Sequence, residues 1–211
     1  MDLDFNVITD NVKKAFDVFV ANIVAYIIGA LIAAFGSFFI ITAAPLMYGL
    51  YTMILKGTRG EKVEIKDVLY GFSSGSIFIR SWIGLLGLMA VPICIMIVYI
   101  ILSIIIGLVI PNSIAFLIMM VLYLIMVIIF LVLGLFLYYS LFIYVMTPSE
   151  NIIYAIKESI AIAKANLIMV LLTMIISGIL GMFTITIPLG WLFAAYMLKE
   201  FKPDLKDNSA I

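Results

Sequence analysis

Histidine is absent from this chain of 211 residues, and charged residues make up only 11% of it. Without histidine, the usual general base of a catalytic triad is missing. The single cysteine, Cys94, lies inside an apolar run and can form neither an internal disulfide nor a multi-cysteine metal site. Because the formal net charge is zero, no basic surface indicates binding to nucleic acid. We therefore predict no catalytic residue, no cofactor site and no metal site.

Hydrophobic residues are abundant instead, at 66% of the chain, compared with roughly 45–50% in a soluble globular domain. Four apolar blocks contain no acidic residue, and they span 18–55, 77–110, 113–146 and 167–198. A helix needs about 20 residues to cross a hydrocarbon core, and each block is longer than that. The sequence therefore predicts an all-α fold, a polytopic transmembrane helix bundle that forms one integral membrane domain over residues 1–211.

The positions of the basic residues predict the topology. Lysine and arginine occur in four groups, at the N-terminus, at 56–80, at 157–164 and at the C-terminus. Basic loops stay in the cytosol, so the first and fourth blocks must cross twice and the other two once. This predicts six crossings, as three helical hairpins in the cell membrane, with both termini cytosolic. The outer turns would lie near 36–45, at 111–112 and near 181–188. The alternative, one crossing per block, would place 56–66 outside.

The second and third blocks are longer than one crossing needs. We expect their cytosolic ends, 77–89 and 134–146, to form bent or tilted extensions near the interface, with Pro92 as a candidate kink. Amphipathic rings favour the headgroup level of a bilayer. We therefore expect the aromatic residues of these ends at that level: Trp82, Tyr138, Tyr139 and Tyr144.

Two segments show helical periodicity with one polar face. The apolar stripe of the first comprises Phe5, Ile8, Val12, Phe16 and Phe19, and that of the second comprises Ile152, Ile153, Ile156, Ile160 and Ala163. In the second, Thr147 can cap the helix, Pro148 suits its first position and Glu150 completes a capping box. We expect both amphipathic helices to lie flat on the cytosolic surface. The alternative is that each is a straight extension of the next crossing.

The same two segments resemble each other, which indicates an internal repeat. Lys13 precedes Asn22 by the same spacing as Lys157 precedes Asn166, and further on a Pro-Leu pair leads to a lysine in both halves. Both copies would enter the membrane from the cytosol, as in a parallel repeat. The predicted copies flank a central hairpin, 1–56 and 148–199 around 77–146. Chance matching in apolar sequence is the alternative.

Small side chains recur at every fourth position of the first predicted crossing. They are Ala21, Ala25, Gly29, Ala33 and Ser37. Such a row lets a neighbouring helix approach closely in lipid, so it is a candidate surface for a protein partner or for self-association. Coincidence in an alanine-rich helix is the alternative.

Three segments carry a family resemblance: 45–72 (PLMYGLYTMILKGTRGEKVEIKDVLYGF), 155–166 (AIKESIAIAKAN) and 187–199 (IPLGWLFAAYMLK). They resemble a broad, mostly uncharacterised group of prokaryotic polytopic membrane proteins, which includes the membrane domain fused to some glycerophosphodiester phosphodiesterases. Asp67, Gly71 and Phe72 match an Asp-Leu-x-x-Gly-Phe-like segment of that group. A later amphipathic helix of the group often carries an aromatic residue and an arginine, where this chain has Ile160 and Lys164. The resemblance implies an architecture more than an activity.

Acidic side chains are densest at Glu61, Glu64 and Asp67, where they alternate with Lys62 and Lys66. This alternation indicates a solvated, salt-bridged loop. The predicted crossings contain no carboxylate and no histidine, the groups that usually mark proton and ion paths. Ion-coupled transport is therefore disfavoured.

The leading hypothesis is a non-enzymatic membrane module that binds a partner or a lipid at its cytosolic face, with the lipid bilayer as its immediate partner. The alternative is a carrier or substrate-binding subunit for a neutral or lipid-like solute, which a solute-sized cavity between hairpins would support. A third possibility, an enzyme acting on lipid at the interface, needs a catalytic constellation that the sequence does not show.

Overall fold

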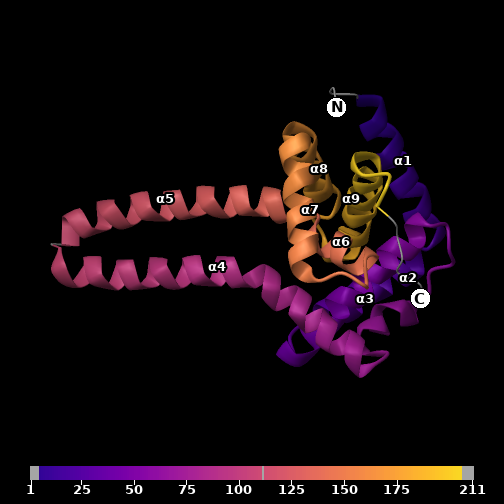
Figure 1. Cartoon of the computed structure of the whole chain (residues 1–211), viewed down its shortest axis with the longest axis horizontal. Helices are drawn as coiled ribbons and strands as arrows, with labels where there is room; N and C mark the ends of the chain where they lie inside the picture. The colour runs from indigo at the N-terminus through magenta and orange to yellow at the C-terminus, as the bar shows by residue number, and fades with distance from the viewer. Residues whose placement is uncertain (1–4, 111, 206–211) are drawn as a thin grey trace.

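A long helical hairpin projects from a bundle of shorter helices, which we call the body (Figure 1). The computed structural model describes residues 5–110 and 112–205. Within these residues the chain forms nine α-helices, two 3-10 helices and no strand. The predicted all-α fold is therefore confirmed for the described part of the chain. The predicted turn at 111–112 includes Pro111, which lies outside the described residues.

The hairpin consists of α4 (Gly75–Val109) and α5 (Asn112–Leu137). The body comprises α1 (Phe5–Ala21), α2 (Ile23–Gly36), α3 (Ile40–Thr58), η1 (Ile65–Phe72), α6 (Ser140–Met146), α7 (Ile152–Ala165), α8 (Leu167–Leu180), η2 (Thr184–Thr186) and α9 (Ile187–Phe201). The turns after α2 and α8 fall where the sequence predicted them, although α3 begins before Pro45 and contains it.

The core of the body is centred on α3 and α9, which pack against each other. Both helices are apolar on nearly all sides, as expected of helices that are buried all round. Met53 of α3 and Phe193 of α9 are fully buried, and burial of such a side chain contributes roughly 1.5–3 kcal/mol. Around this pair, α1 and α8 pack on α9, while α2 and η1 pack on α3.

Two glycines let the 3-10 helix η1 lie directly on α3. A Cβ atom at Gly49 would clash with the backbone carbonyl of Val68, and one at Gly71 would clash with the carbonyl of Pro45. Because the obstacles are backbone atoms, a side chain at either position cannot be accommodated by a rotamer change. The contact between α3 and η1 is therefore a close backbone-to-backbone approach.

A sharp bend separates each amphipathic helix, α1 or α7, from the apolar helix that follows it. The axes of α1 and α2 differ by 88°, and those of α7 and α8 differ by 107°. Asn22 and Asn166 stand at the two bends, and each side-chain amide donates back to the carbonyl four residues earlier, on Val18 and Ile162 respectively. The alternative in which each amphipathic helix continues straight into the next crossing is therefore wrong.

Burial follows the same register in both copies of the predicted repeat. Counted relative to Asn22 and Asn166, corresponding positions of α1 and α7 are buried, and so are several of α2 and α8. The matching buried pairs are Ile8 and Ile152, Asn11 and Ala155, Ala15 and Ser159, Phe19 and Ala163, Tyr26 and Val170, Gly29 and Thr173, and Ala33 and Ser177. The duplication itself stays a prediction, which these coincidences support.

Three helical segments are long and apolar enough to cross a membrane: 40–58, 75–109 and 114–146. The number rises to five if each bent pair is one span. With 14 residues each, α2 and α8 would reach only about 21 Å, whereas a hydrocarbon core is roughly 30 Å thick. The described residues thus contain three to five candidate spans, and the six-crossing arrangement stays a prediction.

The aromatic residues expected at headgroup level differ in their exposure. The segment 134–146 is interrupted by a turn at Tyr138–Tyr139, in keeping with the expected bent extension, and α6 lies in the core. Tyr139 and Tyr144 are buried there, while Trp82 is half-buried. The rings of Tyr139 and Tyr144 therefore contact protein, and their depth in the membrane stays a prediction.

The expected start of the second amphipathic helix is also wrong. Helix α7 begins at Ile152, and its cap is Asn151, whose side-chain oxygen accepts a hydrogen bond of 2.9 Å from the amide of Tyr154. Thr147 ends α6 instead, and its hydroxyl donates to the carbonyl of Ile143. Asparagine is as good a cap as threonine, so the nearer residue defines the helix start.

The apolar stripes of both amphipathic helices are rotated relative to the prediction. In α1 the buried face includes Ile8 and Phe19, whereas Phe5 and Phe16 are exposed. In α7, Ile153 of the predicted stripe is 58% exposed. Each helix therefore packs one face on the body and leaves an apolar edge free beside its charged face.

Candidate functional site

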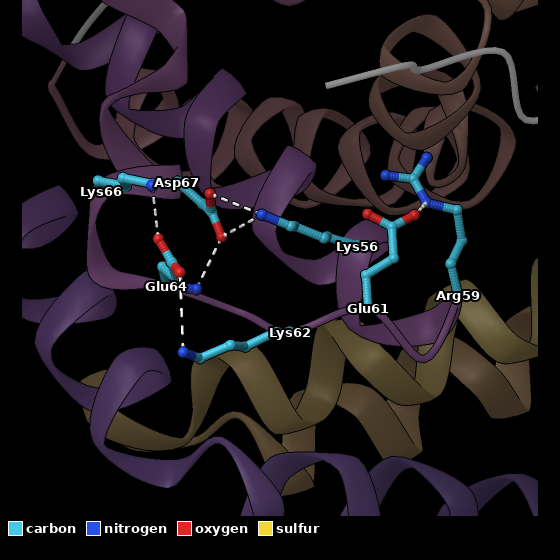
Figure 2. A network of polar contacts seen from close by, with 7 residues as sticks. All are labelled: Lys56, Arg59, Glu61, Lys62, Glu64, Lys66 and Asp67. Carbon is cyan, nitrogen blue, oxygen red and sulfur yellow. Dashed lines mark hydrogen bonds and ion pairs between the residues drawn. The ribbon is translucent and has the colours of Figure 1, made fainter.

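The charged loop between α3 and η1 is held by a buried ion pair (Figure 2). The ammonium of Lys56 lies 3.0 and 3.1 Å from the two carboxylate oxygens of Asp67, which is only 4% exposed. The same carboxylate accepts a hydrogen bond of 2.7 Å from the amide of Glu64. Asp67 therefore connects the end of α3, the loop and the first turn of η1.

The other charged side chains of this loop are more exposed than Asp67, although Arg59 is only 18% exposed. Lys66 approaches Glu64 to 2.6 Å and Lys62 approaches it to 3.9 Å, while Arg59 pairs with Glu61 at 2.6 Å. The hydrogen bond from Lys66 lowers the pKa of the Glu64 carboxyl below its ordinary value. The predicted salt-bridged loop is confirmed for these residues. Asp67 is the exception, because it is buried and its partner Lys56 is only 17% exposed.

Arg80, near the start of α4, joins the hairpin to the end of α6. Its guanidinium donates to the carbonyls of Tyr144, Thr147 and Glu150 at 2.8 to 3.0 Å. The guanidinium carbon also lies 3.9 Å from the centre of the Tyr144 ring, and the Tyr144 hydroxyl donates to the carbonyl of Arg80. A cation at a helix C-terminus satisfies carbonyls that lack a partner. Arg80 therefore anchors one root of the hairpin.

Ser159 of α7 anchors the other root. Its hydroxyl donates to the carbonyl of Phe136 at 2.7 Å and accepts from the amide of Tyr139 at 3.2 Å. These two backbone groups flank the turn between α5 and α6, where the helical hydrogen-bond pattern is interrupted. The hydroxyl of Tyr138, within that turn, forms a hydrogen bond with Ser177 of α8. Residues of α7 and α8 thus hold the end of α5.

A partly open apolar cavity of about 390 Å³ lies between these two roots. Its walls come from α4 and α5, and its floor comes from α3 and α6. The lining residues are Tyr51, Leu88, Met89, Pro92, Phe130, Leu133, Gly134, Leu137, Tyr138 and Leu141. The volume falls within the range of small-molecule sites, roughly 300–1,000 Å³. The two tyrosine hydroxyls are the polar side-chain groups of this lining, so the cavity suits a mainly apolar ligand.

Tyr51 is fixed within the floor of the cavity. Its ring stacks on Trp191 with 4.4 Å between centroids and meets the edge of Phe142 at 4.7 Å. The side chain is 8% exposed. Among the described residues its hydroxyl has no hydrogen-bond partner, in contrast to Tyr138, which bonds to Ser177.

The small-residue row of α2 is used inside the chain. Gly29 and Ala33 are buried, and a Cβ atom at Gly29 would lie 2.9 Å from the sulfur of Met53 in α3. Ala25 is half-buried and Ala21 is exposed. Close helix approach is therefore present between α2 and α3, while association with another chain through this row stays a prediction.

The sequence predicted no catalytic, cofactor-binding or metal-binding residue, and it did not predict which residues line the cavity. Pro92 was singled out only as a kink. No sequence pattern marked Tyr51 or Gly134 as lining a cavity, because the cavity forms only where elements distant in sequence meet. Within residues 5–110 and 112–205 no group of three or more histidine, cysteine or acidic side chains could hold a metal ion.

Comparison with models of known protein families found no match. Curated proteins and solved structures likewise gave no match. The resemblance to the prokaryotic polytopic group therefore stays a proposal, and the site is interpreted from its own geometry.

Proposed function

We propose that this protein is a non-enzymatic membrane module that crosses the bilayer with its hairpin and binds a lipid or a protein partner at its cytosolic face. The observation that carries the proposal is the separation of charge from the hairpin. No charged residue occurs between Arg80 and Glu150, and the most apolar windows of α4 and α5 are not buried by the body. A soluble protein rarely exposes contiguous apolar surface of this extent, whereas lipid contact favours it.

The body supports a placement at the cytosolic surface. All charged side chains of the described chain belong to the body or to the first turns of α4, and the loop of Lys62 and Glu64 is exposed. The bends of 88° and 107° set α1 and α7 nearly perpendicular to α2 and α8. This is the geometry expected of a helix on the membrane surface followed by one that enters it. Both termini are cytosolic in this placement. The six-crossing arrangement, in which α2, α3, α8 and α9 also cross, would instead place the body within the bilayer.

Cysteine labelling tests this placement. In a Cys94→Ala background, Ile101→Cys places a thiol on an exposed position of the hairpin, and Lys62→Cys places one on the charged loop. We expect a charged, impermeant maleimide to label position 62 in inside-out vesicles only. Position 101 should react only after detergent is added, because a thiol in hydrocarbon does not form the reactive thiolate. Labelling of position 62 from the exterior would contradict the proposed orientation.

Binding at the cytosolic face is tested separately by crosslinking and co-purification from native membranes. We expect a lipid or a protein to be enriched with the wild-type chain. A monomer that enriches neither would exclude a binding module.

A carrier or substrate-binding subunit for a neutral or lipid-like solute is the second candidate. The apolar cavity of about 390 Å³ favours it. Reconstituted vesicles distinguish the two functions, since only a carrier moves a lipid-like solute between leaflets or compartments.

A further inference from the structure

We propose that the cavity between the two hairpin roots holds one acyl chain of a membrane phospholipid, with the ester end of that chain at Tyr51. This inference rests on the proposed membrane placement and adds a ligand class and a site to it.

The walls of the cavity are built to keep α4 and α5 apart at their roots. Pro92 lacks an amide hydrogen, so it interrupts the hydrogen bonding of α4 at the cavity wall. On the opposite wall Gly134 has no side chain, and a Cβ atom added there would meet nothing within 4 Å. Figure 1 shows α4 changing direction where the hairpin meets the body. The space is therefore a consequence of this divergence, and the body side chains leave it unfilled.

Water is a poor occupant for this space. A buried water usually makes about three hydrogen bonds to polar groups, and the hydroxyl of Tyr138 already bonds to Ser177. The remaining polar side-chain group of the lining is the Tyr51 hydroxyl. A hydrocarbon chain, in contrast, gains dispersion contacts with the leucines and the phenylalanine of the walls.

Tyr51 accounts for the polar end of the ligand. Its ring is held by Trp191 and Phe142, so the hydroxyl cannot turn to another part of the molecule without breaking both contacts. Tyr51 lines the cavity, and its hydroxyl can donate a hydrogen bond to an occupant. The carbonyl oxygen of a lipid ester accepts one hydrogen bond and is attached to the chain that fills the apolar part.

The position of the cavity selects a bilayer lipid over a water-soluble solute. Its walls continue into the exposed apolar faces of the hairpin, where Leu131 and Val91 are each more than half exposed. In the proposed placement these faces contact hydrocarbon, and the roots lie at the level of the headgroups and esters. A lipid can therefore enter sideways from the bilayer with its ester at the depth of Tyr51.

Tryptophan quenching tests the proposal. Trp82→Phe leaves Trp191, which lies behind Tyr51, as the sole tryptophan. This variant is reconstituted into phosphatidylcholine vesicles with or without brominated acyl chains, because bromine quenches indole fluorescence at short range. We expect strong quenching by the brominated lipid. Adding Gly134→Leu fills the cavity and should remove most of that quenching.

Gly107→Leu is the matched control, since Gly107 is also a hairpin glycine with nothing within 4 Å but does not line the cavity. It should leave the quenching unchanged. Equal quenching in the Gly134→Leu and Gly107→Leu variants would overturn the acyl-chain site even if the labelling of position 101 confirms a membrane hairpin. Labelling of position 101 in intact vesicles would instead remove the membrane placement itself.

Native mass spectrometry tests the polar end of the site. Tyr51→Phe keeps the stacked ring and removes the hydroxyl. We expect the wild-type chain to retain one phosphatidylcholine after detergent extraction and Tyr51→Phe to retain less. Equal retention would overturn the role of Tyr51, and retention of detergent alone by both chains would overturn the lipid site.

Discussion

The pair formed by Lys56 and Asp67 connects the end of α3 to the loop and to η1. The carboxylate is nearly inaccessible to solvent and is also bonded to the amide of Glu64. Removal of one partner from a buried pair leaves an uncompensated charge, which is much more costly than loss of an exposed pair. The neighbouring pair of Lys66 and Glu64 is exposed, so the two lysines offer a direct comparison.

We predict that Lys56→Met destabilises the protein by about 3–5 kcal/mol, because Asp67 is then buried without its cation. Lys66→Met, in the same loop, should leave stability nearly unchanged, because its pair with Glu64 is exposed to solvent. Thermal unfolding in detergent micelles, followed by circular dichroism, measures both. Equal melting temperatures for the two variants would show that the pair of Lys56 and Asp67 contributes no more to stability than an exposed ion pair.

At the scale of elements, the contact of η1 with α3 is a close approach of two backbones. It depends on Gly49 and Gly71, which leave no atoms between the two backbones. The 3-10 helix in turn packs Val68 against α2 near Gly29. The small residues of three elements therefore form one closely packed unit.

We predict that Gly49→Ala lowers the free energy of unfolding by about 1–3 kcal/mol, because the added methyl group collides with the carbonyl of Val68. Gly178→Ala is the control, since this position also lies within a helix and its Cβ would meet nothing within 4 Å. It should be neutral or stabilising, as alanine favours a helix over glycine. Denaturant titration of both variants measures the difference, and a stable Gly49→Ala protein would rule out the backbone contact.

For the whole molecule, the junction of hairpin and body is the decisive feature. Arg80 holds α4 through three carbonyls, and Ser159 holds α5 through one carbonyl and one amide. The two roots are thus bound to different parts of the body, with the cavity between them. The relative position of hairpin and body depends on these few polar contacts.

We predict that Ser159→Ala destabilises the junction by about 1–3 kcal/mol, because the amide of Tyr139 and the carbonyl of Phe136 lose their partner. Hydrogen exchange at residues 136–140 should become faster, while exchange in α3 and α9 stays slow. Ser149→Ala, at an exposed position, should leave both rates unchanged. Unaltered exchange in Ser159→Ala would mean that the turn is held by packing alone.

Hydropathy predicted the helical class and the hairpin, because long apolar blocks free of acidic residues have few other solutions in lipid. It did not reveal that Tyr139 and Tyr144 are buried, since an aromatic residue in an apolar block suits an exposed position in the headgroup region and a core position equally well. Ser159, on a helix distant in sequence, accepts a hydrogen bond from the amide of Tyr139 and so holds the turn that leads into the core. The cavity was equally hidden, because Tyr51 and Gly134 come together only in the folded chain.

The reach of the hairpin has a consequence for how the protein responds to its host membrane. From Pro92 to Val109, α4 extends about 27 Å along its axis, slightly less than an average bilayer interior of roughly 30 Å. In the proposed placement, a thicker bilayer draws the body toward the lipid or thins locally around it, and a thinner one lets the body rise. Lipid composition would thereby set how deeply Tyr51 sits.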